Sequence, residues 1–424
     1  MDGCAEGPGL HPSPTLQPRI NALLDLPARA PLLGFTLPTN MSSATTTASV
    51  FHGLLRHVEP KYTPWLWLAP LLVAFVVGVL MTPVVIRLAK RYGVIDQPIG
   101  AKIHLRPTPL LGGVAVYVAF LVACLLFLPI VGPIRGILIG GAVAVAVGVT
   151  DDRLKLSPLP HLAGQILAAV VAIVFGLGGV TKIDAPFASA AQIANGNGGW
   201  VVPAWLGVFF ALFWLVGMMN TFNFVDGLDG LSSGVGIISA IMLAWWAAIY
   251  GGSNFGHADL VLPLILAGAL LGFLPYNWHP AKIFIGDAGA MFVGLGLGAM
   301  WIFDSAKVGT ALIVLSIPIL DVAWAIVRRQ MHGKSFLTGD KQHVYHRMIE
   351  LGMSQTATVL VLYSLLLVLG VIDLALTRSD KLIAFVVIAM LIGAAFIGLE
   401  IAGNRRQARA ANKEHRRKLP ASGS

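Results

Sequence analysis

The sequence predicts an all-α membrane protein with about eleven transmembrane helices, because long apolar runs recur along the chain. Of its 424 residues, 56% are hydrophobic and only 12% are charged, and the mean hydropathy is +0.79. The runs reach the length of about 17–25 residues that a helix needs to cross a bilayer. These values exclude the soluble globular classes.

The predicted spans follow one another along the chain with polar loops between them. They are 66–89, 112–130, 134–149, 160–180, 203–219, 231–250, 260–276, 288–303, 307–328, 356–376 and 382–402. Residues 66–402 form the predicted membrane domain. Residues 1–65, rich in Pro, Ser and Thr, are a predicted disordered extension, and 403–424 are a basic cytoplasmic tail. The two cysteines, Cys4 and Cys124, exclude a disulfide framework.

Basic residues fall mainly on one side of the predicted spans. Alternate loops and the tail together hold eighteen lysines and arginines, whereas the opposite loops hold three. Lys and Arg favour the cytoplasmic side of a membrane, so the basic side is predicted to be cytoplasmic. The net charge of +9 is therefore an orientation signal and an attraction to membrane lipids, and it does not predict a nucleic-acid partner.

Every conspicuous polar motif also falls on this basic side, which predicts a cytoplasm-facing active-site cleft. The motifs are Lys102-Ile-His104 with Gly112-Gly113, Asp151-Asp152, the segment from Asn220 to Asp229, the segment from Asn277 to Asp287, and the segment from His343 to Arg347.

The segment Asn220-Thr-Phe-Asn-Phe-Val-Asp-Gly-Leu-Asp-Gly-Leu231 is the most informative of them. Asp226 and Asp229 offer oxygen ligands or anionic acceptors, and their adjacent glycines let the backbone bend toward a ligand. The adjacent carboxylates of Asp151 and Asp152 repel each other, so a site that holds both requires a cation or a proton. Mg²⁺ shared with a substrate phosphate meets that requirement. The alternative is a solvated acidic pair beside Lys155.

The two remaining motifs also have alternative interpretations. Asp287 is either a metal ligand or a helix N-cap, and Phe284 either stacks on a planar base or packs at a span end. His343, His346 and Arg347 offer donors to a diphosphate, although a basic surface loop or a Zn²⁺ site without an evident third ligand are alternatives. Asp321, inside a span, is predicted to have a structural role as the partner of Arg328 or Arg329.

These motifs resemble those of the polyprenyl-phosphate N-acetylhexosamine-1-phosphate transferases, also called glycosyltransferase family 4. The resemblance covers about residues 66–402 and rests mainly on three patterns. They are Asn220-x-x-Asn-x-x-Asp-Gly-x-Asp-Gly-Leu231, Asp151-Asp152-x-x-Lys155 and Phe284-x-Gly-Asp287.

The resemblance implies a polytopic inner-membrane enzyme that takes a UDP-sugar as donor and a polyprenyl phosphate as acceptor, and releases UMP. Asp287 is then expected to hold Mg²⁺, with Mn²⁺ as an alternative ion, and Asp151 is the candidate base and second metal contact, supported by Asp152. A homodimer is the protein partner considered. The remaining expected substrate-binding residues are Lys102, Lys155, Asn220, Asn223, Asp226, Asp229, Asn277, Phe284, His343, His346 and Arg347.

The last cytoplasmic motif indicates which sugar is transferred. In the family, three consecutive histidines mark the phospho-MurNAc-pentapeptide branch, whereas His-x-His-His-Arg marks the GlcNAc branch. Here Tyr345 replaces the middle histidine of the second pattern, so UDP-GlcNAc is the favoured donor and the MurNAc-pentapeptide donor the alternative. His161 and Leu110 also depart from the family pattern, standing where lysine and arginine are common.

An ion-coupled transporter is the alternative from another functional class. A transporter predicts acidic residues in the middle of the spans, whereas the acids here lie at span ends on one side.

Overall fold

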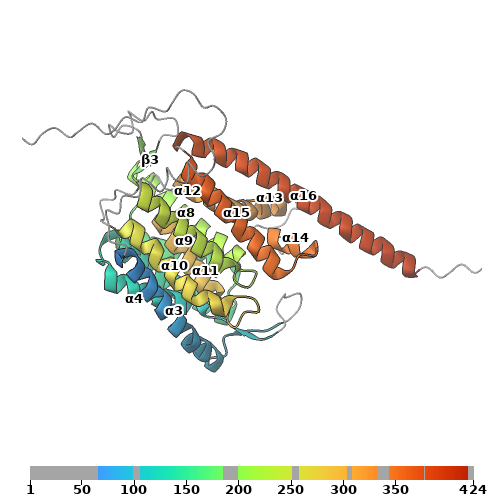
Figure 1. Ribbon diagram of the computed structural model, residues 1–424, viewed down its shortest axis with the longest axis horizontal. Helices are drawn as coiled ribbons and strands as arrows, with labels where there is room; N and C mark the ends of the chain where they lie inside the picture. The colour runs from blue at the N-terminus through green and yellow to red at the C-terminus, as the bar shows by residue number, and fades with distance from the viewer. Residues whose placement is uncertain are drawn as a thin grey trace, which may run out of the picture. The chain divides into compact units, whose positions relative to one another are not determined.

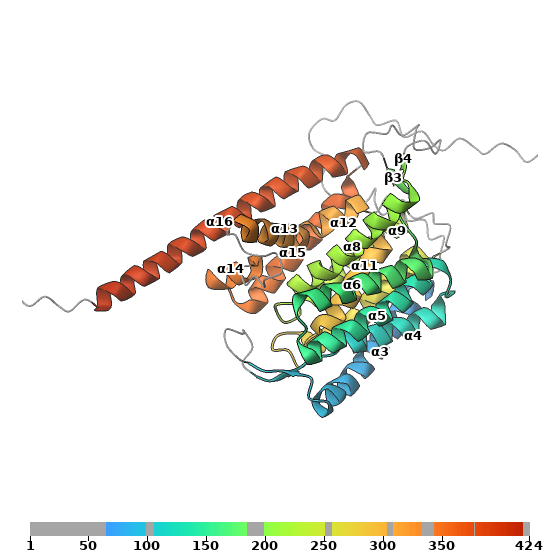
Figure 2. The ribbon, with the colours of Figure 1, turned by 180° about the vertical axis from the view of Figure 1, so that it is seen from behind.

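The structure is a computed structural model, and it describes residues 65–98, 106–184, 199–250, 257–302, 308–331, 343–376 and 378–418. Residues 1–64 of the predicted extension, and Lys102 of the first basic loop, lie outside the described residues. The described part is helical, as predicted, and its helices lie side by side (Figures 1 and 2).

Helices occupy every predicted span. They are α3 (Trp65–Arg91), α4 (Gly112–Phe127), α5 (Gly132–Leu154), α6 (Pro158–Ala172) with the π-helix η1 (Ile173–Leu177), α8 (Ala204–Val225), α9 (Leu231–Tyr250), α10 (Ala258–Asn277), α11 (Gly286–Ile302), α12 (Val308–Val314), α13 (Ser316–Met331), α14 (Val344–Glu350), α15 (Gln355–Ala375) and α16 (Arg378–Lys418). By length and composition, 8 of the described helices could cross a membrane, or 9 if the bent pair α12–α13 is one span. The shorter apolar α4 and α11 account for the remaining predicted spans.

Several helices run past the predicted span ends. Asp151 and Asp152 lie in the last turn of α5, and Asn220 and Asn223 lie in the last turns of α8, where loops were predicted. Part of the reason is that polar side chains here bond back to the helix, as when Asn220 Nδ2 donates to the carbonyl of Val216 at 2.8 Å. The predicted loop 329–355 contains α14, and α16 continues through most of the predicted tail.

Two short antiparallel ladders were not predicted. Strand β1 (Ile95–Asp96) pairs with β2 (Thr108–Pro109), with Ile95 opposite Pro109. Strand β3 (Lys182–Asp184) pairs with β4 (Gly199–Val201), with Ile183 opposite Trp200. Two or three residues per strand carry too little alternation for a sequence pattern to show.

Helix α11 is the centre of the membrane domain. Every residue from Ala288 to Ile302 is buried, and the helix packs against α4, α5 and α8. Small residues permit these close approaches, because a side chain on Gly148 of α5 would collide with the backbone of Ala288. The buried helix thereby places its N-terminal end, with Asp287, among the ends of its neighbours.

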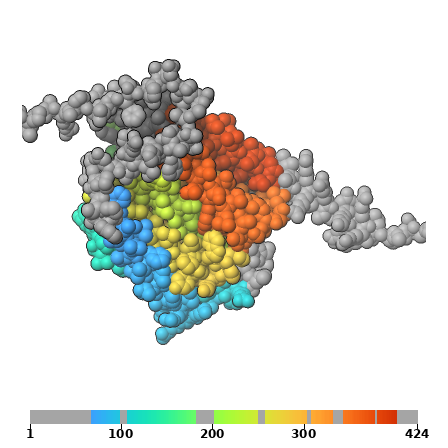
Figure 3. Space-filling model, in the orientation of Figure 1, coloured from blue at the N-terminus to red at the C-terminus, as the bar shows by residue number. Residues whose placement is uncertain are grey.

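Apolar side chains cover the outside of the domain. In α3, an exposed leucine or valine recurs at every fourth position, namely Leu68, Leu72, Val76, Leu80, Val84 and Leu88. The opposite side of α3 packs against α10, and the two lie against each other in Figure 3 (blue and yellow). Such apolar stripes suit a lipid environment.

The span 307–328 is broken. Helices α12 and α13 meet at an angle of 78°, and Pro318, in the first turn of α13, has no N–H to bond to the preceding turn. Helix α16 packs against both halves. Near its start, Lys381 Nζ donates to Asp373 Oδ2 of α15 at 2.9 Å and to Thr310 Oγ1 of α12 at 2.5 Å. This buried ion pair joins three helices.

Candidate active site

Backbone pairing fixes the loop that leads into α11. The amide N–H groups of Gly112 and Gly113 donate to the carbonyls of Phe284 and Ile285 at 3.0 and 2.8 Å, and the N–H of Phe284 donates to Pro109 at 2.9 Å. A Cβ atom on Gly113 would overlap the backbone of Gly289. The Gly-Gly pair is thus needed for close backbone approach, and it holds the segment before Asp287 in place.

Asp152 caps α11 from the end of α5. Its Oδ1 accepts from the N–H of Asp287 at 3.0 Å, and its Oδ2 accepts from the N–H of Ala288 at 3.3 Å. Gly286 has a left-handed φ of +69° and no side chain to displace the carboxylate. The helix cap predicted as an alternative for Asp287 is therefore supplied by Asp152, and Asp287 keeps its own carboxylate for other partners.

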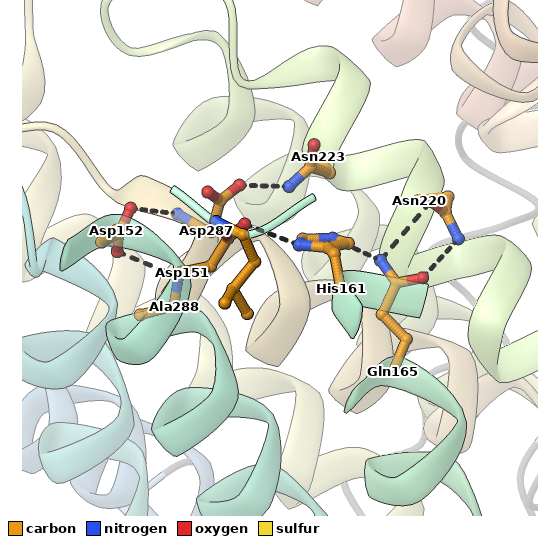
Figure 4. Close-up of polar contacts among 9 residues, drawn as sticks. Asp151, Asp152, His161, Gln165, Asn220, Asn223, Asp287 and Ala288 are labelled. Carbon is orange, nitrogen blue, oxygen red and sulfur yellow. Dashed lines mark hydrogen bonds and ion pairs between the residues drawn. The ribbon is translucent and has the colours of Figure 1, made fainter. Parts of the chain in front are cut away.

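The carboxylate of Asp287 lies at the junction of three helices (Figure 4). Asn223 Nδ2 of α8 donates to Asp287 Oδ1, and the carboxyl group of Asp151 of α5 lies within hydrogen-bonding reach of Asp287. Two carboxyl groups this close require a shared cation or proton. The structure thus brings Asp151, Asn223 and Asp287 together, and their function as one active site stays a prediction.

Asp151 is oriented by further contacts. His161 Nδ1 lies 2.6 Å from Asp151 Oδ2, and the N–H of Leu156 donates to Asp151 Oδ1 at 2.6 Å. Behind His161, Gln165 and Asn220 continue the chain of side-chain hydrogen bonds (Figure 4). His161 and Gln165 were not predicted as site residues. The sequence signal that could have found them is two polar residues one turn apart in the otherwise apolar α6.

Asp226 lies just after α8, close enough to Asp152, Asp229 and Asp287 to interact electrostatically with them. Burial raises the pKa of Asp226 well above its ordinary value, and the nearby carboxylates of Asp287, Asp152 and Asp229 raise it further, against a backbone hydrogen bond from Gly286. Asp226 thus lies partly buried among acids, in surroundings that disfavour its charged form.

Asp229 and Asn277 support the loop between α10 and α11. Asp229 Oδ2 lies 2.7 Å from His279 Nδ1 and accepts from the N–H of Ala281 at 3.1 Å. Asn277 accepts from Ser233 Oγ at 2.8 Å and donates to the carbonyl of Ile283 at 3.0 Å. Both residues therefore shape this loop, and their contact with a nucleotide stays a prediction.

The last polar motif is buried. Asp321 of α13 accepts from the N–H of Val344 at 3.1 Å, which caps α14, and its Oδ2 lies 2.9 Å from His343 Nδ1. His343 and Arg347 are 3% and 6% exposed, so the basic surface loop considered as an alternative is wrong for them. Asp321 thus supports the start of α14, and it has His343 as a partner that the sequence did not suggest.

Tyr345 packs over the Asp226–Asp229 turn. Its ring stacks at 5.8 Å on that of His343 and lies 4.4 Å from that of His346, measured between centroids. A Cβ atom on Gly227 would collide with the Tyr345 hydroxyl. Burial raises the pKa of Tyr345, and Asp321 and Asp226 raise it further, so the hydroxyl stays protonated. The tyrosine that stands in place of the family's histidine thus packs its ring against Gly227, which has no side chain to obstruct it.

Two other predicted residues lie at the edge of this group. Lys155 is exposed and takes a left-handed conformation, with φ 53°, directly after α5. Phe284 is half-buried and packs against the apolar core, which supports the packing alternative without testing whether it stacks on a base.

The acidic group suits an ion that takes few protein ligands. Among the residues that the structure describes, no three His, Cys, Asp or Glu side chains are arranged to hold a metal. The adjacent carboxyl groups of Asp151 and Asp287 offer two ligands. Mg²⁺ commonly binds one or two carboxylates and completes its shell with water and substrate phosphates, so this pair fits it.

Helices able to cross a membrane, with a buried acidic site where several of them end, define an integral membrane protein of the polytopic class. Sequence comparison narrows the class. The glycosyl transferase family 4 profile matches residues 134–304, which include Asp151, Asn223 and Asp287.

Individual relatives agree with that match. The decaprenyl-phosphate N-acetylglucosaminephosphotransferase of Mycolicibacterium smegmatis is 34% identical over 307 residues, covering 65% of this chain and 73% of the relative. The probable undecaprenyl-phosphate N-acetylglucosaminyl 1-phosphate transferase of Bacillus subtilis is 31% identical, covering 76% and 89%. The undecaprenyl-phosphate alpha-N-acetylglucosaminyl 1-phosphate transferase of Escherichia coli is 29% identical, covering 65% and 74%. The chain belongs to glycosyl transferase family 4, the polyprenyl-phosphate N-acetylhexosamine-1-phosphate transferases.

Proposed function

We propose that this protein transfers GlcNAc-1-phosphate from UDP-GlcNAc to a polyprenyl phosphate of the undecaprenyl type, and thereby starts a cell-wall or surface polysaccharide. The observation that carries the proposal is the meeting of Asp151, Asn223 and Asp287 from three helices. The names of the relatives, which give decaprenyl phosphate or undecaprenyl phosphate as the acceptor, support the choice of substrates.

The transfer exchanges one phosphoanhydride bond for another. An oxygen of the lipid phosphate attacks the phosphorus that carries GlcNAc, and a new P–O–P bond forms. The bond between that phosphorus and the oxygen bridging to the uridine phosphate breaks, and its electron pair leaves with UMP. A phosphate monoester has a second pKa near about 6, so the acceptor is largely ionised already. The enzyme therefore lowers the activation barrier mainly by positioning the two phosphates and by stabilising their charge.

The acidic residues have distinct roles in this proposal. Asp287 and Asp151 would hold Mg²⁺, which when bound would neutralise charge on the diphosphate. Asp151 also faces the incoming lipid phosphate as its base or positioning group. Asn223 orients Asp287 by donating to its Oδ1. Asp152 fixes the start of α11 and so the position of Asp287.

The remaining roles follow from position. Phe284, before α11, is proposed to stack on uracil, with Asp226 near the nucleotide. Lys102, Lys155, His346 and Arg347 are proposed to bind the diphosphate or the sugar. The charge distribution of the loops supports an inner-membrane location with the site facing the cytoplasm.

Transfer by the purified protein in detergent tests the proposal. Mg²⁺ and undecaprenyl phosphate are supplied, with radiolabelled UDP-GlcNAc in one reaction and UDP-MurNAc-pentapeptide in another. Label is expected in lipid only from UDP-GlcNAc, with UMP released in equal amount. Label only from the MurNAc donor would overturn the choice of sugar. Folded protein that transfers neither sugar would overturn the proposed activity.

A further inference from the structure

A chain of four side chains runs from α8 to Asp151. Asn220 Nδ2 donates to Gln165 Oε1 at 2.7 Å, Gln165 Nε2 lies 2.9 Å from His161 Nε2, and His161 Nδ1 lies 2.6 Å from Asp151 Oδ2. We infer that His161 is a positioning residue, which the chain holds as the neutral Nδ1–H tautomer so that it donates one hydrogen bond to Asp151.

The contacts of Asn220 determine which groups donate and which accept in this series of hydrogen bonds. Asn220 Nδ2 also donates to the carbonyl of Val216 at 2.8 Å, within α8, which identifies this atom as the amide nitrogen. Since Asn220 donates through it to Gln165, the Gln165 atom that receives the bond is the amide oxygen. The amide nitrogen of Gln165 then faces His161, and it also lies 3.4 Å from Asn220 Oδ1 as a donor.

An amide nitrogen can only donate, so His161 Nε2 must accept. A neutral imidazole with an accepting Nε2 carries its proton on Nδ1. That proton points at Asp151 Oδ2, and this carboxyl oxygen is its acceptor. Gln165 is fully buried, so water does not compete for its donor. The network therefore allows one arrangement of protons without leaving a buried polar group unsatisfied.

The consequence concerns the geometry of Asp151. The N–H of Leu156 binds Oδ1 and His161 binds Oδ2, so both oxygens are fixed and the plane of the carboxylate is set. Each oxygen keeps a second lone pair for a ligand. This inference rests on the proposed function, in which Asp151 faces the lipid phosphate.

Two substitutions of His161, both to amide side chains, distinguish the roles of its two ring nitrogens. The side-chain nitrogen of His161→Asn takes the place of Nδ1, whereas that of His161→Gln takes the place of Nε2. We expect His161→Asn to keep kcat within about threefold of the wild-type value, and His161→Gln and His161→Ala to lose about tenfold or more, the loss expected for one hydrogen bond to a charged group. The KM for UDP-GlcNAc is expected to change less than about twofold, since Asp287, the other group proposed to hold the ion on the donor diphosphate, is left in place.

A spectroscopic measurement gives a readout that does not depend on activity. In protein labelled with ¹⁵N-histidine, the difference between wild type and His161→Asn isolates the two His161 nitrogens. Nδ1 is expected to carry the proton and Nε2 to have none, and Gln165→Leu is expected to abolish this preference. A proton on Nε2 in the wild type, or equal kcat values for the Asn and Gln variants, would overturn the inference. Wild-type protein without transfer would instead refute the proposed function and leave the tautomer result standing.

Discussion

Asp152 accepts hydrogen bonds from two amides in the first turn of α11, those of Asp287 and Ala288. One acid thus fixes the backbone of another that lies 135 residues away in the chain. A carboxylate at a helix N-terminus also interacts favourably with the helix dipole. The two aspartates are therefore expected to respond differently to the same substitution.

Asp287→Asn is expected to abolish transfer, with a loss of more than about 100-fold in kcat, because a charge that stabilises the reacting groups is removed. The amide oxygen still accepts from Asn223, so the thermal midpoint in detergent is expected to shift little. Turnover is measured with UDP-GlcNAc and undecaprenyl phosphate, and unfolding by fluorescence. Activity close to that of the wild type would sink the assignment of Asp287 as a metal ligand.

Asp152→Asn is expected to destabilise the protein as well as slow it. One of its acceptor oxygens becomes an amide nitrogen that faces a backbone N–H, and a buried donor without an acceptor costs about 1–3 kcal/mol. The thermal midpoint is therefore expected to fall below that of Asp287→Asn, measured in the same detergent. If both variants unfold at the same temperature, the capping role of Asp152 is wrong.

Gly113→Ala is expected to prevent correct folding, since its Cβ would overlap the backbone of Gly289. Gly217→Ala is the matched control, because its Cβ meets no atom within 4 Å and alanine favours a helix over glycine by up to about 1 kcal/mol. The yield of monodisperse protein on size-exclusion chromatography separates the two. Equal yields would show that the 109–113 and 284–289 segments lie further apart.

The raised pKa of Asp226 predicts a pH dependence of stability. The ordinary pKa of an aspartate is about 3.9, and that of Asp226 is well above its ordinary value because of burial and neighbouring acids. An acid whose pKa is raised in the folded state contributes its full stability below its unfolded pKa. That contribution is lost as the pH rises through the folded pKa. Asp226→Asn is therefore expected to raise the thermal midpoint at neutral pH, and the gain should disappear toward pH 4. The measurement uses chelator, without Mg²⁺, and a gain independent of pH would contradict it.

Lys381→Met is expected to cost about 3–5 kcal/mol, because it leaves the carboxylate of Asp373 buried without its cation. Asp373 is 1% exposed. The double variant with Asp373→Asn removes both charges and is expected to recover most of the loss in thermal midpoint. A double variant as unstable as the single one would show that the ion pair itself, and not the unpaired charge, decides stability.

The membrane helices were predictable because lipid imposes one rule on the whole chain, that long apolar runs become helices. The helix ends were less predictable. Asp151 and Asn220 are polar, which suggested loops, but their side chains are satisfied within the protein and the helices continue through them. The two short ladders depend on backbone pairing between loops, which leaves no periodic signal in so few residues.

The candidate site could be predicted in composition but not in arrangement. Carboxylates beside apolar spans indicated a site, and Asp151 and Asp287 do meet. The supporting roles of Asp152, Asp229 and Asn277 depend on which backbone groups lie opposite them, and this is decided by tertiary packing. The contact of His161 with Asp151 was missed for the same reason, since a lone histidine in an apolar helix has many other uses.

The fit between Tyr345 and Gly227 links two positions that lie more than a hundred residues apart in sequence. A tyrosine at the middle of the last motif leaves no room for a side chain at position 227, whereas the smaller ring of histidine reaches less far. In evolutionary terms, the glycine should be obligatory wherever the tyrosine occurs. A chain that first replaced the glycine at position 227 could no longer accept tyrosine at position 345. Exchange between histidine and tyrosine at position 345 is therefore expected only in chains that keep the glycine.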